Sequence, residues 1–545
     1  MSNFRCLVAE KKWSFLLIYF ILLFNPVFYF WAENISLLDK SMAWLTVIVV
    51  GLALCCISLF LKKKGEKIYL IVLFLLSLAP NLIVWSYLYI SDLYMKRDMF
   101  WVIFTTHATE SKEFVGQFVS WQMILAGITY ILAGIFFLVK ARSKQALSIR
   151  KYWGLFTFSV LIVLASIILQ YLVQAIPTFD FYKSRVLYSM ENRIFQKEKE
   201  LRRNLKMDVQ CILPDSINHT FVVIIGESTT SCHMSLYGYF RETTPLMDSQ
   251  REELDIYTDV ITPDTHTFGV MQKVLTFASH DHPEYFRQKP SMVEMFNSAG
   301  FETYWISNKA FLTKWGGSYG IIAEEAEHLY DLSPYKQPDG IVVPYLEEIL
   351  NDSIQGNKII FIHLMGNHHA YNSRYPKSFE YFDYEKRGDL DADFRNASMK
   401  ETIDEYDNSI LYGDFVFNSI LEQIKKINGS SSLLFFADHG EEVYDYRDAR
   451  GHFMSNVFPS QCQIPFVLWR SETYKKEMPD IVIDTSRPYS IENVIYSLSS
   501  LTGLQYEENN QEASIFSAAY KVPERRLVGA EDYDREIIHK LDKKE

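Results

Sequence analysis

The hydrophobic positions divide the chain into two parts of different character. Up to about residue 176, apolar runs of roughly 20 residues follow one another, which is the length a helix needs to cross a bilayer core. Beyond that point, short β-branched or aromatic runs alternate with patterns typical of amphipathic helices. The sequence therefore predicts a transmembrane domain at 1–176, a linker at 177–217 and a soluble domain at 218–545.

Five membrane-spanning helices are expected. They lie at about Trp13–Ala32, Ala43–Leu61, Ile68–Ile90, Trp121–Val139 and Trp153–Ala175. Lysine and arginine gather before the first span, after the second and between the fourth and fifth, and such clusters belong on the cytoplasmic side. Five crossings then place the N-terminus in the cytoplasm and the soluble domain outside, which in a bacterium means an inner-membrane protein with a periplasmic domain.

The linker contains one amphipathic pattern. Its apolar residues are spaced for one face of a helix, at Leu187, Met190, Ile194, Leu201 and Leu205. Charged residues occupy the other positions, so we expect a bridging helix along the membrane surface.

The soluble part is expected to be an α/β domain. Its candidate strands are Phe221–Ile225, Thr303–Ile306, Lys358–Leu364, Leu433–Ala437 and Pro465–Trp469. Candidate helices lie between them, at Ser291–Ser298, Tyr345–Leu350 and Ile403–Ile424. This alternation predicts a mostly parallel sheet with helices on both faces, and such sheets bind ligands at the carboxyl ends of their strands.

Residues able to bind a metal follow three of these strands. Glu227 follows the first strand, His368 the third, and Asp438 and His439 the fourth, while His452 comes thirteen residues after His439. A single Asp-His pair is more often part of a turn, but acid and imidazole side chains at several strand ends together favour zinc or a similar ion.

A nucleophile is expected next to such a metal. Thr267 opens an apolar helical stretch that reaches Phe277. A helix N-terminus and a metal would both favour its alkoxide. The simpler interpretation is that Thr267 or Thr265 only caps the helix.

Composition excludes two classes of protein. The net charge is -12, and the soluble part has no cluster of lysine and arginine, which argues against a nucleic-acid partner. Six cysteines in 545 residues exclude a disulfide scaffold. Only Cys211, Cys232 and Cys462 are expected outside the membrane, which leaves room for at most one internal disulfide.

Several motifs carry a family resemblance. Val222–Thr229, Met234–Tyr239 and Arg241–Pro245 resemble the opening motif of the bacterial phosphoethanolamine transferases. His363–His368 and Asp438–Glu441 resemble two further motifs of that family, in the same order. The resemblance covers nearly the whole chain, and the wording Ser-Leu-Tyr-Gly-Tyr looks closest to the branch that modifies the lipopolysaccharide core.

The resemblance implies an alkaline-phosphatase/sulfatase-like α/β/α fold and a two-step reaction. The threonine would take phosphoethanolamine from phosphatidylethanolamine and pass it to lipopolysaccharide, on a core heptose or a lipid A phosphate. The enzyme would contact membrane lipids at the level of their headgroups. We expect it to be a monomer. A lipid A acceptor would also predict resistance to polymyxin-like cationic peptides, because the added ethanolamine lowers the surface negative charge.

The resemblance also assigns roles to individual residues. It implies one or two zinc ions, with ligands at Glu227, Thr267, Asp438 and His439. His368 and His452 match positions that hold the phosphate or a second zinc. Three further positions line the substrate site in relatives: Thr106, Glu110 and, within about one residue of register, Lys314.

Three alternatives remain open from the sequence. A lipoteichoic-acid-type phosphoglycerol transferase shares the five spans and a threonine nucleophile. An inactive, membrane-anchored binding protein would be expected to have lost at least one metal ligand. A true sulfatase needs Cys/Ser-x-Pro-x-Arg, which neither Cys232 nor Cys462 begins.

Overall fold

The computed structural model describes residues 2–30, 37–91, 95, 100, 103–104, 112, 115–116, 118–141, 145–173, 176–187, 205, 207–214, 217–309, 320–352, 356–383, 395–453 and 456–540. The chain forms two compact units, Met1–Glu191 and Asn192–Glu545. Of the predicted linker helix, residues 177–187 are helical. Met190, Ile194 and Leu201 lie outside the described residues, so the bridging helix and the exact domain limits stay predictions.

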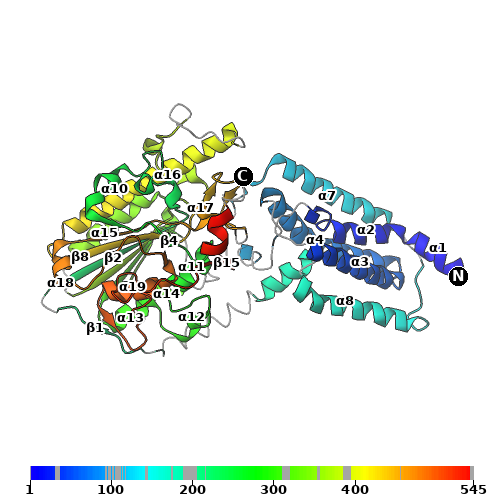
Figure 1. Ribbon diagram of the computed structural model, residues 1–545. Coiled ribbons are helices and arrows are strands. Elements are labelled where there is room, and N and C mark those ends of the chain that lie inside the picture. Colours follow the sequence, from blue (N-terminus) through cyan, green and yellow to red (C-terminus); the bar gives the residue numbers. More distant parts are fainter. Residues whose placement is uncertain are drawn as a thin grey trace. The chain divides into compact units, whose positions relative to one another are not determined.

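The first unit is built from helices (Figure 1). They are α1 (Ser2–Glu10), α2 (Lys12–Leu23), α3 (Leu37–Leu59), α4 (Lys63–Ser91), α7 (Trp121–Lys140) and α8 (Trp153–Val173). Within the described residues, α3, α4 and α7 are long and apolar enough to cross a membrane. The first and fifth predicted spans fall on shorter apolar helices, Lys12–Leu23 and Trp153–Ile168.

Two prolines affect these helices differently. α2 ends at Leu23, just before Asn25 and Pro26, whereas α4 continues through Pro80. Hydrogen bonds link polar side chains near these prolines: the Asn25 amide, just after α2, donates to the Asn81 Oδ1 of α4 at 3.1 Å. Asn81 in turn donates to the Tyr130 hydroxyl at 2.9 Å. Hydrogen bonds of this kind hold apolar helices together where burial alone provides little attraction.

The second unit is an α/β domain around a seven-stranded sheet. Its strand order is β3 (Leu254–Ile256), β11 (Phe466–Arg470), β8 (Ser430–Ala437), β2 (His219–Gly226), β7 (Lys358–His363), β5 (Glu302–Ser307) and β6 (His328–Asp331). The five strands from β8 to β6 are parallel, and β11 is antiparallel to its neighbours. The predicted fold class is confirmed, and all five predicted strands are present within one to three residues of their expected limits.

Helices cover both faces of the sheet (Figure 1). Val223 and Ile225 of β2 pack into one buried cluster and Val222 and Ile224 into the other, as expected where alternate residues of a strand point to opposite faces. The first cluster includes residues of α11 (Thr267–Val274), α13 (Met292–Ser298) and α19 (Val494–Leu501). The second includes residues of α15 (Val342–Asn351) and α16 (Ala397–Lys425).

A small hairpin lies outside the main sheet. β9 (Glu442–Val443) pairs with β10 (Arg450–Gly451), and Glu442 stands opposite Gly451. This pairing brings the residues on either side of the hairpin, Glu441 and His452, next to each other. We call residues 441–452 the β9–β10 hairpin.

Candidate metal centre

The strand order brings the predicted metal ligands together. β2 lies between β8 and β7, and the three strands are parallel. Their carboxyl ends therefore share one edge of the sheet. Glu227 follows β2, Asp438 and His439 follow β8, and His368 follows β7 by five residues.

Three of these side chains form a tight, buried group. The ligand atoms of Glu227, Asp438 and His439 all lie within 4.8 Å of one another. His439 Nε2 is 3.5 Å from Asp438 Oδ2 and 3.8 Å from Glu227 Oε1. Glu227 Oε2, Asp438 Oδ2 and His439 Nε2 have no hydrogen-bond partner in the described part of the chain. Buried polar atoms without partners are costly, so this set fits a bound cation, and its oxygen and nitrogen donors suit zinc.

Thr267 reaches this group from a distant part of the sequence. It is the first residue of α11, and its hydroxyl donates to Glu227 Oε1 at 2.8 Å. His266 occupies the N-cap position and makes no side-chain capping bond, while the Thr265 hydroxyl donates to the Phe453 carbonyl. The simpler interpretation, that one of these threonines only caps the helix, is therefore wrong.

A buried lysine that the motifs did not identify completes the group. Lys309 Nζ lies 2.5 Å from Glu227 Oε1 and donates to Thr267 Oγ1 at 2.9 Å. It comes two residues after the end of β5, the strand next to β7. Lys314, which the resemblance indicated for such a role, lies outside the described residues. Ligands bind at the carboxyl ends of parallel strands, and β5 was among the predicted strands. Applying the same reasoning to the end of β5 could have identified Lys309.

The two auxiliary histidines lie beside the same group. His368 Nε2 is 3.9 Å from Glu227 Oε1. The His452 ring centroid is 4.3 Å from that of His439. Burial, together with neighbouring histidines and cations, lowers the pKa of His368 and of His452, so both imidazoles are neutral near pH 7.

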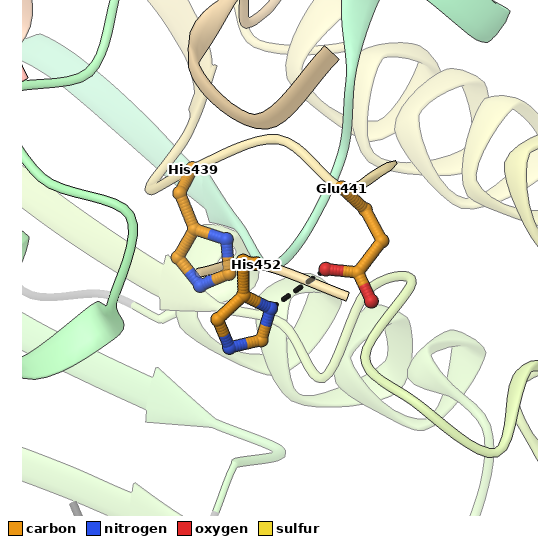
Figure 2. Close-up of side chains that lie close together, drawn as sticks. All are labelled: His439, Glu441 and His452. Carbon is orange, nitrogen blue, oxygen red and sulfur yellow. Dashed lines mark hydrogen bonds and ion pairs between the residues drawn. The ribbon is translucent and has the colours of Figure 1, made fainter. Parts of the chain in front are cut away.

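Glu441 orients His452, as Figure 2 shows. The two residues are the two ends of the β9–β10 hairpin, and His452 Nδ1 lies 2.6 Å from Glu441 Oε2. The other carboxylate oxygen of Glu441 accepts from the Tyr371 hydroxyl at 2.8 Å. Burial raises the pKa of Glu441 to about 7. His439, Glu441 and His452 form a second group whose ligand atoms lie within 4.8 Å of one another. Glu441, to which the sequence assigned no role, is therefore also a candidate residue of the site.

Glycines let the strand-end loops approach one another. Gly366 has φ +53, and a Cβ atom there would lie 2.5 Å from the Glu227 carbonyl oxygen. A Cβ atom on Gly440 would lie 2.1 Å from the carbonyl oxygen of Ser460. The loop after β7 is also tied to Glu227 by the Asn367 N–H, which donates to the same carbonyl at 2.8 Å.

The remaining predicted substrate residues cannot be placed. Thr106 and Glu110 lie outside the described residues, as Lys314 does. Cys211, Cys232 and Cys462 are free thiols in this structure.

Comparison with known proteins identifies the family. The protein-family model described as Sulfatase matches residues 219–504, just over half of the chain. The chain belongs to the sulfatase family. Within it, the chain belongs to the phosphoethanolamine transferases, because it is 32% identical to the crystallised C-terminal periplasmic domain of EptC from Escherichia coli, solved in complex with zinc. That match covers 61% of this chain and 96% of the EptC domain, with a TM-score of 0.58.

For other relatives of this sulfatase-family protein, the similarity also covers the membrane unit. The chain is 28% identical over 499 residues to phosphoethanolamine transferase EptC of Escherichia coli strain K12, covering 86% of each. It is equally similar to phosphoethanolamine transferase CptA of Salmonella typhimurium. The integral membrane protein EptA from Neisseria meningitidis shares the fold, with a TM-score of 0.65, 17% identity and coverage of 94% of this chain and 98% of EptA.

Proposed function

We propose that this chain transfers phosphoethanolamine from phosphatidylethanolamine to lipopolysaccharide, through a phosphoethanolamine group held on Thr267. The observation that carries the proposal is the Thr267 hydroxyl hydrogen-bonded to Glu227 inside a group of buried, unpaired metal-binding atoms. The names of the relatives support the same reaction. The protein acts in the inner membrane, with its C-terminal domain in the periplasm.

Glu227, Thr267, Asp438 and His439 would hold one zinc ion. When bound, zinc lowers the pKa of a coordinated hydroxyl and neutralises charge on phosphoryl oxygens. The zinc-bound EptC domain supports this choice of metal. Metal analysis of the purified chain tests it: one zinc per chain is expected, and the Asp438→Asn variant should retain less than about a tenth.

The first step forms a bond between Thr267 Oγ1 and phosphorus and breaks the bond from phosphorus to the diacylglycerol oxygen. Glu227 Oε1 already accepts a hydrogen bond from the Thr267 hydroxyl and is the group that would receive its proton. The Lys309 ammonium is placed to stabilise negative charge at the reacting oxygens. The proton finally resides on the diacylglycerol hydroxyl, and the neutral imidazoles of His368 and His452 are the groups that carry it there.

The second step reverses the first with a different oxygen. An oxygen of the lipopolysaccharide acceptor attacks the phosphorus, the bond to Thr267 Oγ1 breaks, and Thr267 takes back a proton. We propose a core sugar as the acceptor, because the Ser-Leu-Tyr-Gly-Tyr wording resembles the core-modifying branch. Thr106, Glu110 and Lys314 are proposed to contact the donor headgroup or its phosphate, and a monomer is sufficient for the reaction.

Mass spectrometry of lipopolysaccharide tests the proposal. Cells expressing the wild type should gain one phosphoethanolamine unit on the core fraction, and cells expressing Thr267→Ala should not. A gain on lipid A instead would change the acceptor and predict resistance to cationic peptides. No gain on either fraction would favour a phosphoglycerol transferase or an inactive binding protein, and metal content would decide between those two.

A further inference from the structure

Residues 404–409 of α16 contact the segments that carry the candidate site. The Tyr406 hydroxyl donates to the carbonyl of Ser228, the neighbour of Glu227, at 2.7 Å. The side chain of Asn367, the neighbour of His368, donates to the Ser409 hydroxyl at 2.7 Å. A third contact runs through His233, which directly precedes the Met234–Tyr239 segment of the opening motif and has no role in the resemblance or in the proposed reaction.

His233 lies between two carboxylates. Its Nδ1 is 2.6 Å from Asp407 Oδ1 on α16, and its Nε2 is 2.8 Å from Asp445 Oδ1 in the β9–β10 hairpin. Carboxylate oxygens only accept hydrogen bonds, so both ring nitrogens must carry a proton and the ring is an imidazolium. Burial opposes this charge, but Asp445 and Asp407 outweigh it and raise the pKa of His233 to about 10.

The same carboxylate of α16 binds two more side chains of the motif. Asp407 Oδ2 accepts from Arg241 at 2.7 Å and from the Tyr239 hydroxyl at 3.0 Å. Arg241 also donates to Asp404 at 2.9 Å. His233, Arg241 and Asp407 are almost fully buried. Arg241 of the motif and His233 beside it therefore present two cations to α16, and His233 also reaches the hairpin.

The contact with Asp445 affects the geometry of the hairpin. The other oxygen of Asp445 accepts from the Val443 N–H at 3.1 Å, so His233 holds the segment that directly follows Glu441. Glu441 in turn holds His452. We propose that His233, as an imidazolium between Asp407 and Asp445, is a positioning residue that fixes the β9–β10 hairpin on α16 and thereby sets the place of Glu441 and His452 beside Thr267.

Charge, more than packing, accounts for the choice of residues. A buried ion pair is often no more stabilising than apolar side chains of the same volume, but it orients its partners strictly. Removing the cation would leave Asp445 without its imidazolium partner, while Asp407 would stay paired with Arg241. The two carboxylates would no longer be bridged, and the repulsion between them would loosen the hairpin from α16. Small displacements of a catalytic side chain can lower the rate by about a hundredfold.

The test compares variants of the full-length chain in detergent micelles. His233→Gln removes the charge, Asp445→Asn is isosteric and removes one partner, and the double variant removes both. His328→Gln serves as the matched control, because His328 is on the edge strand β6, away from the hairpin, and pairs with Glu302 of β5. Three measurements are made: steady-state kinetics with phosphatidylethanolamine, which gives kcat and KM; bound zinc; and amide hydrogen exchange of residues 441–452.

We expect His233→Gln to lower kcat about tenfold or more, with KM within about twofold and zinc retained. Exchange of the hairpin amides should become faster, while α16 stays protected. Asp445→Asn should have an intermediate effect, and the double variant should recover part of the kcat lost in His233→Gln because the buried repulsion is gone. His328→Gln should match the wild type in all three measurements.

Two results would overturn the inference. One is an unchanged kcat and unchanged hairpin exchange in His233→Gln. The other is loss of zinc and of global protection together with kcat, with no recovery in the double variant, which would make His233 a residue of the fold only. The kcat readout rests on the proposed function, but the exchange readout does not. If the wild type transfers no phosphoethanolamine, hairpin exchange alone decides the inference.

Discussion

At the level of single residues, Lys309 is the group whose role is most open to test. It is buried, contacts both Glu227 and Thr267, and lies where negative charge would develop on the reacting oxygens. Lys309→Met keeps the length of the side chain and removes the charge. We expect kcat to fall about a hundredfold to a thousandfold, the usual effect of losing one such donor. Steady-state kinetics with phosphatidylethanolamine measures this.

The matched control is Lys475→Met on α18 (Glu472–Glu477), where the lysine is exposed and pairs with Glu472. It should retain the wild-type rate, because exposed ion pairs contribute little. A rate for Lys309→Met within a few fold of the control would remove Lys309 from the mechanism.

Gly366 allows a second prediction at this scale. Gly366→Ala adds a Cβ against the backbone of Glu227 and places alanine at φ +53. Gly238→Ala is the matched control, because Gly238 has φ +97 and nothing within 4 Å of its Cβ position. Both variants should lose about 1–3 kcal/mol of stability from backbone strain. Only Gly366→Ala should also lose zinc and activity, and equal zinc content in both variants would contradict the proposed importance of this close approach.

At the level of elements, strand β2 carries an unusual histidine at its first position. His219 is fully buried, and neither ring nitrogen has a hydrogen-bond partner in the described residues. Burial lowers the pKa of His219 below the usual histidine value of 6.5. The unfolded chain therefore binds more protons than the folded chain just below pH 6.5, so the contribution of this residue to stability falls as the pH falls through that range.

His219→Phe should remove this pH dependence. Phenylalanine is similar in volume, and the histidine ring already stacks on Phe221 at 6.1 Å. Thermal unfolding of the full chain at pH 7.5 and pH 5.5 measures the effect. The wild type should lose up to about 1.4 kcal/mol per pH unit more than the variant across this range. His282→Phe, at an exposed histidine, should behave as the wild type, and parallel curves for all three proteins would show that His219 titrates normally.

The elements that build the site differ in how far the local sequence predicts them. β2, β7 and β8 can be recognised locally because each is a short apolar run followed by polar residues. The β9–β10 hairpin cannot, since its two strands are only two residues each and include charged side chains. Tertiary contacts select this pairing, which is why the sequence alone assigns Glu441 no role.

At the level of the whole molecule, the number of membrane crossings remains a prediction that experiment can settle. Three described helices are long and apolar enough to span, and two shorter ones coincide with the other predicted spans. Five crossings place residue 217 outside. Alkaline phosphatase fused after residue 217 should be active in the periplasm, whereas a fusion after residue 64 should be inactive. The reverse pattern, or activity at both positions, would contradict five spans with a cytoplasmic N-terminus.

The sequence by itself determined what depends on neighbouring residues: the apolar spans, the alternation of strands and helices, and the presence of Glu227, His368, Asp438 and His439 at strand ends. Thr267 could be proposed but not chosen over a helix cap, because capping and nucleophilic roles use the same residue at the same position. Tertiary structure decided the rest. The order of β8, β2, β7 and β5 sets which strand ends meet, and it brings Lys309 to Thr267, 42 positions away in the sequence. Such contacts depend on which strands become neighbours in the sheet, and no local pattern in the chain encodes that.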